Sequence, residues 1–146
     1  MNSRPSTDLG LLLLRLPIGA LFVFAGWIKI FKMGVGNFVE GSMKFVPPYL
    51  PPAVGKGYLY AVPFAELLVG ICLLLGFATR AIGLITALML VSFMMAVTGW
   101  KDPQGGPFNL SVAYCCVALA LMLLGPGRIS VDALLPRRGR GGKPKE

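Results

Sequence analysis

Long apolar runs, separated by short stretches rich in Gly, Pro or polar residues, dominate the pattern of this sequence. A helix needs about 20 mostly apolar residues to cross a bilayer core of ~30 Å. Four runs approach that length, and we expect a membrane-crossing helix in each: about residues 9–31, 58–77, 81–98 and 108–124. The pattern therefore predicts an all-α fold, an integral membrane four-helix bundle.

The connections between these runs differ in length. "GFATR", residues 76–80, is so short that the second and third helices must form an antiparallel hairpin. Residues 32–57 form the long connection, and their prolines exclude a continuous helix through 47–52. Before the prolines, apolar residues recur at helical spacing, which predicts a short helix lying flat at the outer interface. An ordinary amphipathic connector is favoured over a lid.

Composition supports the membrane class. The 146 residues are 55% hydrophobic and 14% charged, with a mean hydropathy of +0.73, which excludes an ordinary soluble domain. There is no histidine, and the three cysteines Cys72, Cys115 and Cys116 form no CxxC or metal-ligand spacing. We expect no metal site and interpret the cysteines as small apolar packing residues.

The net charge of +8 is unevenly distributed and predicts the orientation. With a cytoplasmic N-terminus, eight basic residues lie on the cytoplasmic side, against four, Lys32, Lys44, Lys56 and Lys101, outside. Because cytoplasmic segments carry the excess of Lys and Arg, we expect both termini to be cytoplasmic. Residues 136–146, "PRRGRGGKPKE", are expected to form a disordered basic tail that touches anionic lipid, not nucleic acid, after a single domain of residues 1–135.

Three charges fall inside the predicted spans: Arg15 and Lys29 in the first and Glu66 in the second. At ~1.5 Å per residue, Glu66 lies between the two bases in depth, roughly 10 Å from each. Both bases share one stripe of the first helix with two glycines, and Glu66 lies on a stripe with Gly70. The two stripes are expected to pack together, so that Glu66 faces the bases. Depth alone does not choose between Arg15 and Lys29.

Two interpretations of Glu66 remain open. As a structural element it clamps two helices together without any chemistry. As a functional element it belongs to a polar site near the outer leaflet, joined by Trp100, Asn109, Ser111 and Tyr114. Trp100 and Tyr114 also suit an aromatic belt at the membrane interface, and Asn109 also suits the cap of the fourth helix.

Three segments resemble the DoxX family. "LLLRLPIGALFVFAGWIKIF" is similar to the family's first helix, and "FAELLVGICLLLGFATRAIGL" is similar to its second helix, its LLGxxTR turn and the start of its third. "LGPGRISVDALL", residues 124–135, resembles the family's C-terminal GPGxxSxD segment. We expect Ser130 to cap a short helix there and Arg128 to pair with Asp132, which together with Arg80 form a structural motif at the cytoplasmic mouth.

The resemblance implies a small, multi-pass protein of the plasma (inner) membrane. Some family members are subunits of a thiosulfate:quinone oxidoreductase, and others are partners of thiol or oxidative-stress enzymes. Members often carry a histidine near the end of the third helix, where this sequence offers Trp100 and Lys101, and this departure weakens the case for proton-coupled quinone chemistry.

Three hypotheses about function follow. The first is an accessory subunit or partner of a membrane redox or thiol-stress system, with quinone as the associated cofactor. Since no cofactor motif is encoded, electrons would come from a partner oxidoreductase, and autonomous catalysis is not expected. The second is a non-catalytic assembly or anchoring factor. The third is a small-molecule permease acting as a homo-oligomer.

Overall fold

A computed structural model describes residues 5–97 and 110–134 of the chain, and these residues are helical, without strands. The order is α1 (Pro5–Trp27), η1 (Ile28–Lys32), α2 (Val35–Ser42), η2 (Met43–Phe45), α3 (Pro52–Leu75), α4 (Thr79–Val97), α5 (Leu110–Leu124) and α6 (Val131–Leu134). The element η1 is a π-helix and η2 is a 3-10 helix. The prediction of an all-α chain is confirmed for this part of the sequence.

The long helices agree with the predicted apolar runs, with differences at their ends. α3 begins at Pro52, six residues before the predicted 58, because proline is well tolerated in the first helical turn, where its missing N–H has no partner to lose. The helix ends at Gly76, which adopts the left-handed conformation with φ 68°. The short helix predicted between 32 and 57 is present as α2.

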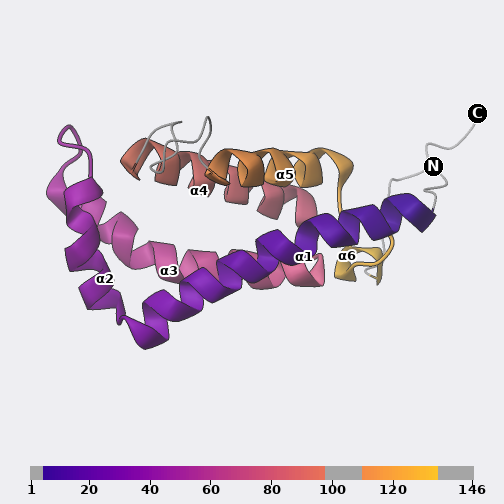
Figure 1. The fold of residues 1–146 in the computed structure, drawn as a ribbon, viewed down its shortest axis with the longest axis horizontal. Helices are drawn as coiled ribbons and strands as arrows, with labels where there is room; N and C mark the ends of the chain where they lie inside the picture. Colours follow the sequence, from indigo (N-terminus) through magenta and orange to yellow (C-terminus); the bar gives the residue numbers. More distant parts are fainter. Residues whose placement is uncertain (1–4, 98–109, 135–146) are drawn as a thin grey trace, which may run out of the picture.

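The long helices pack as two pairs (Figure 1). α1 packs chiefly on α3, and α4 packs on α5, whereas contacts between the two pairs are sparser. Glycines allow the close approach within each pair. A Cβ at Gly26 would lie 2.7 Å from the Pro63 carbonyl oxygen, and a Cβ at Gly83 would lie 2.8 Å from that of Ala118.

The predicted packing of the Arg15 stripe on the Glu66 stripe is present between α1 and α3. A Cβ at Gly70 would lie 2.8 Å from the Gly19 carbonyl oxygen, so the backbones of the two helices almost touch. Ile18 and Leu73 are fully buried in the core beside this crossing. Glu66 is buried on the same face of α3. The glycine pattern of the sequence thus located this helix pair correctly.

The outer surface of the described residues carries many large apolar side chains. Phe24 on α1, Leu68 on α3 and Leu123 on α5 are each more than 60% exposed. Within residues 5–97 and 110–134, two helical segments, Ser6–Lys32 and Pro52–Leu75, are long and apolar enough to cross a membrane. α4 and α5 are also apolar but shorter. An apolar exterior around a core that contains charges is the arrangement expected of a protein surrounded by lipid.

Candidate functional site

Lys29 and Glu66 form an ion pair between the end of α1 and the middle of α3. The ammonium Nζ of Lys29 donates a hydrogen bond to Oε1 of Glu66. The Lys29 side chain is 21% exposed and the Glu66 side chain 3%. The sequence left the partner of Glu66 open, and the structure places Lys29 there. Removing either charge would leave the other one poorly solvated, which is the main energetic consequence of such a pair.

Lys29 lies within the π-helical turn η1. Met33 N–H donates to the Ile28 carbonyl at 2.9 Å, the five-residue spacing of a π-turn. The rings of Trp27 and Phe31, which flank Lys29, contact each other with centroids 4.1 Å apart. A π-turn holds more residues per turn than an α-helix, so it rotates the following side chains from their regular positions. Such turns occur frequently at functional sites.

Two aromatic rings border the ammonium group. Its Nζ lies 5.0 Å from the ring centroid of Phe38 and 5.6 Å from that of Phe93. Both distances are within the range of a cation–π interaction, which is stronger where water is excluded. Phe38 belongs to α2 and Phe93 to α4, so four elements meet at the pair: η1, α2, α3 and α4. The sequence pattern gave no sign that either ring belongs to the site.

The second carboxylate oxygen of Glu66, Oε2, is buried and has no hydrogen-bond partner among the described residues. A buried carboxylate oxygen without a partner is uncommon because its desolvation is not compensated. A polar group of a bound molecule would provide that compensation. The site therefore offers an acceptor, Oε2, beside a donor, the Lys29 ammonium.

Arg15, the other predicted partner of Glu66, lies in a different place. Its side chain is 1% exposed, and Nη2 donates to the Ile129 carbonyl, just before α6. Its charge also interacts with that of Asp132. A Cβ at Gly76 would collide with the Arg15 guanidinium, so only glycine fits at this turn. Arg15 therefore links α1 to the α3–α4 turn and the α6 region.

Asp132 completes this second polar cluster. Its Oδ1 accepts from the Ala78 amide at 2.7 Å and its Oδ2 from the Thr79 amide at 3.0 Å, which caps the start of α4. Ala78 has a positive φ of 46°, a conformation that these contacts hold. The structure records no ion pair between Asp132 and Arg128 within residues 5–97 and 110–134, and the described partners of this carboxylate are the two backbone amides.

The remaining residues of the predicted cytoplasmic motif also have defined partners. Ser130 Oγ accepts from the Ala133 amide at 3.2 Å, the predicted cap of the short helix, and donates to the Gly127 carbonyl. The Arg128 backbone amide donates to Oδ1 of Asp8 at 2.9 Å, a contact that the sequence did not suggest. Arg80 is exposed, and its guanidinium lies beside Gly125. This end of the protein is a set of caps and turn contacts.

Ser111 and Tyr114 are the remaining candidate residues that the structure describes, and neither is a member of the ion pair. Tyr114 is half-buried and packs against the hydrophobic core, and the structure records no hydrogen bond between it and Glu66. Trp100 and Asn109 lie outside the described residues. Among residues 5–97 and 110–134, no group of acidic, cysteine or histidine side chains is suited to hold a metal ion.

Comparisons with known proteins agree with the resemblance noted in the sequence. The DoxX family model matches residues 10–100, a range that contains Lys29, Glu66 and both flanking phenylalanines. Over 134 residues the chain is 29% identical to inner membrane protein YqjF of Escherichia coli strain K12, with 90% of this chain and 95% of that protein covered. No solved structure matches the chain. The chain thus belongs to the DoxX family of membrane proteins.

Proposed function

We propose that this protein is an accessory subunit or partner of a membrane redox or thiol-stress system, in which the Lys29–Glu66 pair holds the polar head of a quinone. In this proposal α1 with η1, α3, α4 and α5 all cross the inner membrane, and both termini are cytoplasmic. Residues 1–135 form the membrane domain, and residues 136–146 form a basic tail at the lipid surface. The catalytic centre belongs to a partner oxidoreductase.

The observation that carries the proposal is the buried Oε2 of Glu66, which has no partner in the part of the chain that the structure describes, beside the Lys29 ammonium. A charged side chain at mid-bilayer costs about 2.5 to 3.5 kcal/mol on insertion scales. Burial of either charge is therefore unfavourable unless it pairs with the other charge or with a ligand. The pair provides a hydrogen-bond donor for a carbonyl oxygen and an acceptor for a hydroxyl group. This combination suits a quinone, whose oxygen atoms are carbonyl groups in the oxidised form and hydroxyl groups in the reduced form.

The surroundings of the pair support the same ligand class. Phe38 and Phe93 border the Lys29 ammonium and give the pair aromatic surroundings, which suit the ring of a quinone. A quinone, when bound, would supply the two-electron chemistry that the chain's own side chains lack. Lys29 and Glu66 would orient its head, and the buried environment would limit access of water.

The membrane location and orientation are supported by independent features. The similarity to an inner membrane protein covers nearly the whole of both chains. The large exposed apolar side chains of α1, α3 and α5 suit a lipid surrounding. Eight basic residues on the proposed cytoplasmic side, against four outside, favour cytoplasmic termini.

Quinone content provides the test. The full chain is purified in a mild detergent, and the quinone extracted per protein is compared for wild type, Glu66→Gln, Lys29→Gln and Lys32→Gln. Lys32 is an exposed base at the end of the same π-turn and serves as the matched control. We expect quinone in wild type and Lys32→Gln, and at least a tenfold loss in the other two variants if each retains its elution profile.

Equal quinone content in all four folded proteins would contradict the ligand proposal. A thiol or redox enzyme that co-purifies equally with wild type and Glu66→Gln would instead support an anchoring factor. Uptake of a solute by vesicles containing only this protein would support a permease.

A further inference from the structure

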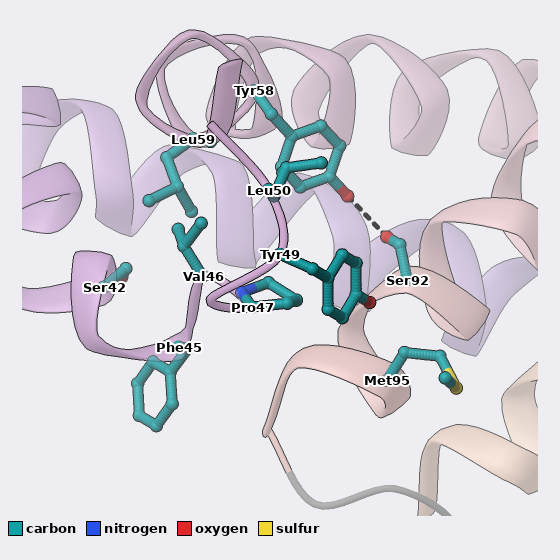
Figure 2. A pocket seen from close by; sticks show the side chains of 11 residues that line it. Ser42, Phe45, Val46, Pro47, Tyr49, Leu50, Tyr58, Leu59, Ser92 and Met95 are labelled. Carbon is teal, nitrogen blue, oxygen red and sulfur yellow. Dashed lines mark hydrogen bonds between the residues drawn. The ribbon is translucent and has the colours of Figure 1, made fainter. Parts of the chain in front are cut away.

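A cavity lies apart from the ion pair, near the start of α3 (Figure 2). Its volume is about 270 Å³, and the segment from Ser42 to Leu50, the first turns of α3 and the end of α4 line it. Neither residue of the ion pair contributes to its walls. A Cβ at Gly55 would collide with the side chain of Val46, so this segment packs tightly on α3 beside the cavity. The cavity is therefore a separate candidate site.

The mouth of the cavity opens on the apolar exterior of the protein. Tyr49 and Met95 line the cavity, yet these residues are 78% and 62% exposed. Tyr58, which also lines it, is 44% exposed. Since the chain belongs to a family of membrane proteins, lipid chains have access to an apolar opening of this kind. An occupant can therefore enter from the membrane without crossing water.

The interior of the cavity suits a hydrocarbon chain. None of its lining residues is charged, and most of the lining surface is apolar, so a charged group inside would lose its hydration without compensation. At roughly 30 Å³ for each group the size of a water molecule, the cavity holds about nine methylene groups. This is only part of a phospholipid acyl chain. The headgroup and the rest of such a lipid would therefore remain outside, at the mouth.

A cation and two hydroxyl groups border the cavity on the segment from Ser42 to Leu50. Lys44 is exposed, and its Nζ lies 5.0 Å from the ring centroid of Phe45, which is a wall residue. The hydroxyls of the wall residues Ser42 and Tyr49 have no recorded hydrogen bond among the described residues. An ammonium group and hydroxyl groups can all donate to phosphate or ester oxygens. The border of the cavity thus offers the groups that a phospholipid headgroup requires.

The other two hydroxyls of the wall serve the fold. The Tyr58 hydroxyl bonds Ser92 Oγ, the contact drawn as a dashed line in Figure 2. This bond joins α3 to α4 across the cavity wall. It is satisfied without any ligand, so the donors available to an occupant come from the segment that carries Lys44.

We infer that this cavity holds part of one acyl chain of an anionic phospholipid from the surrounding membrane, with the lipid phosphate at Lys44. The chain fills a void that would otherwise lack dispersion contacts. Lys44 favours an anionic headgroup over a zwitterionic one, because the cation of a zwitterionic lipid competes with the ammonium group for the phosphate. The inference does not depend on the quinone proposal.

The test measures which phospholipid the full chain retains. The protein in mild detergent receives equal amounts of phosphatidylglycerol and phosphatidylcholine with identical acyl chains, and native mass spectrometry counts the lipid that stays bound. We expect wild type to retain phosphatidylglycerol about fivefold more than phosphatidylcholine, the contribution of one base near an anionic lipid. Equal retention of the two lipids, or retention of neither, would overturn the inference.

Charge variants locate the headgroup. Lys44→Gln should remove the preference for phosphatidylglycerol and leave retention of phosphatidylcholine unchanged. Lys32→Gln is the matched control, because Lys32 is also exposed but does not line the cavity, and its preference should equal that of wild type. The wild-type preference in Lys44→Gln, or an equal loss in both variants, would contradict the position of the headgroup.

Cavity variants locate the acyl chain. Leu59→Trp and Met95→Trp each place an indole in the cavity and should lower retention of both lipids. Met95 is an exposed wall residue, so its substitution provides a folded variant if Leu59→Trp does not fold. Leu68→Trp, at an exposed position of α3 outside the cavity, should retain lipid as wild type does. Thermal unfolding shows which variants are folded, and wild-type retention in a folded Met95→Trp and a folded Leu59→Trp would overturn the inference.

Discussion

Arg15 and Lys29 are two basic residues on one stripe of one helix, yet the protein uses them in different ways. Arg15 is almost fully buried among backbone groups at the α3–α4 turn and near Asp132. Lys29 is partly exposed and bonds a carboxylate whose second oxygen has no partner among the described residues. Both environments contain buried polar atoms without partners among the described residues, Nε and Nη1 of Arg15 and Oε2 of Glu66, but the Arg15 guanidinium lies among backbone groups of the turn, whereas the Lys29 ammonium lies beside a carboxylate acceptor. Helix position alone therefore does not identify a functional charge.

The largest expected effect is at Arg15. Arg15→Met removes the charge that balances Asp132 and the bond to the Ile129 carbonyl, and we expect a loss of about 3 to 5 kcal/mol in the free energy of unfolding. Denaturant unfolding in a fixed detergent measures it. Arg128→Met is the control because that side chain is exposed, and its effect should stay within about 0.5 kcal/mol. Similar stability of the two variants would contradict a structural role of Arg15.

The second-largest expected effect concerns the close contact of α1 with α3 near the ion pair. In Gly26→Ala the new methyl group would meet the Pro63 carbonyl oxygen at 2.7 Å, so we expect a loss of about 1 to 3 kcal/mol in unfolding free energy. Gly36→Ala is a matched control because a Cβ there has no heavy atom within 4 Å. Denaturant unfolding compares the two variants. An equal loss of unfolding free energy in Gly26→Ala and Gly36→Ala would argue against the close contact of α1 with α3.

Glu66→Gln should cost less than either change. The amide keeps an acceptor for Lys29 while removing the negative charge, so we expect a loss of about 1 kcal/mol and a folded protein. A double-mutant cycle with Lys29→Met, read by thermal unfolding, measures the coupling between the two side chains. A coupling indistinguishable from zero would show that the ion pair contributes nothing to the fold.

The smallest expected effect concerns the two aromatic rings. Phe38→Leu and Phe93→Leu each remove one cation–π contact with Lys29, and each should lower stability by about 0.5 to 1 kcal/mol. The diagnostic comparison repeats each substitution in a Lys29→Met background, where the contribution of the cation is gone. A loss that is the same in both backgrounds would assign the effect to packing alone.

Much of the α1–α3 pairing could be predicted from the sequence, because glycine spacing and helix periodicity are local properties. Gly19, Gly26 and Gly70 indicated the contact faces, and the same periodicity placed Glu66 toward α1. The choice between Arg15 and Lys29 could not be predicted, because it depends on the distant residues that surround Arg15. The regular rise per residue does not include such tertiary contacts.

The contacts that complete both polar regions join residues far apart in the chain. Phe93 reaches Lys29 from α4, and Asp132 reaches Ala78 from α6. Periodicity describes which face of a helix is apolar, but it does not say which distant helix end will lie against it. The hydrogen bond between the Tyr58 and Ser92 hydroxyls likewise joins α3 to α4, and no local pattern predicts it.

The bond from the Thr79 amide to Asp132 spans 53 positions of the chain. The ribosome therefore completes α3, α4 and α5 before it makes the carboxylate that caps the start of α4. Until then, the left-handed Ala78 backbone lacks the acceptor that holds it. The turn between α3 and α4 consequently reaches its final conformation late in biosynthesis, and a nascent chain that stops before residue 132 would carry this turn without its cap.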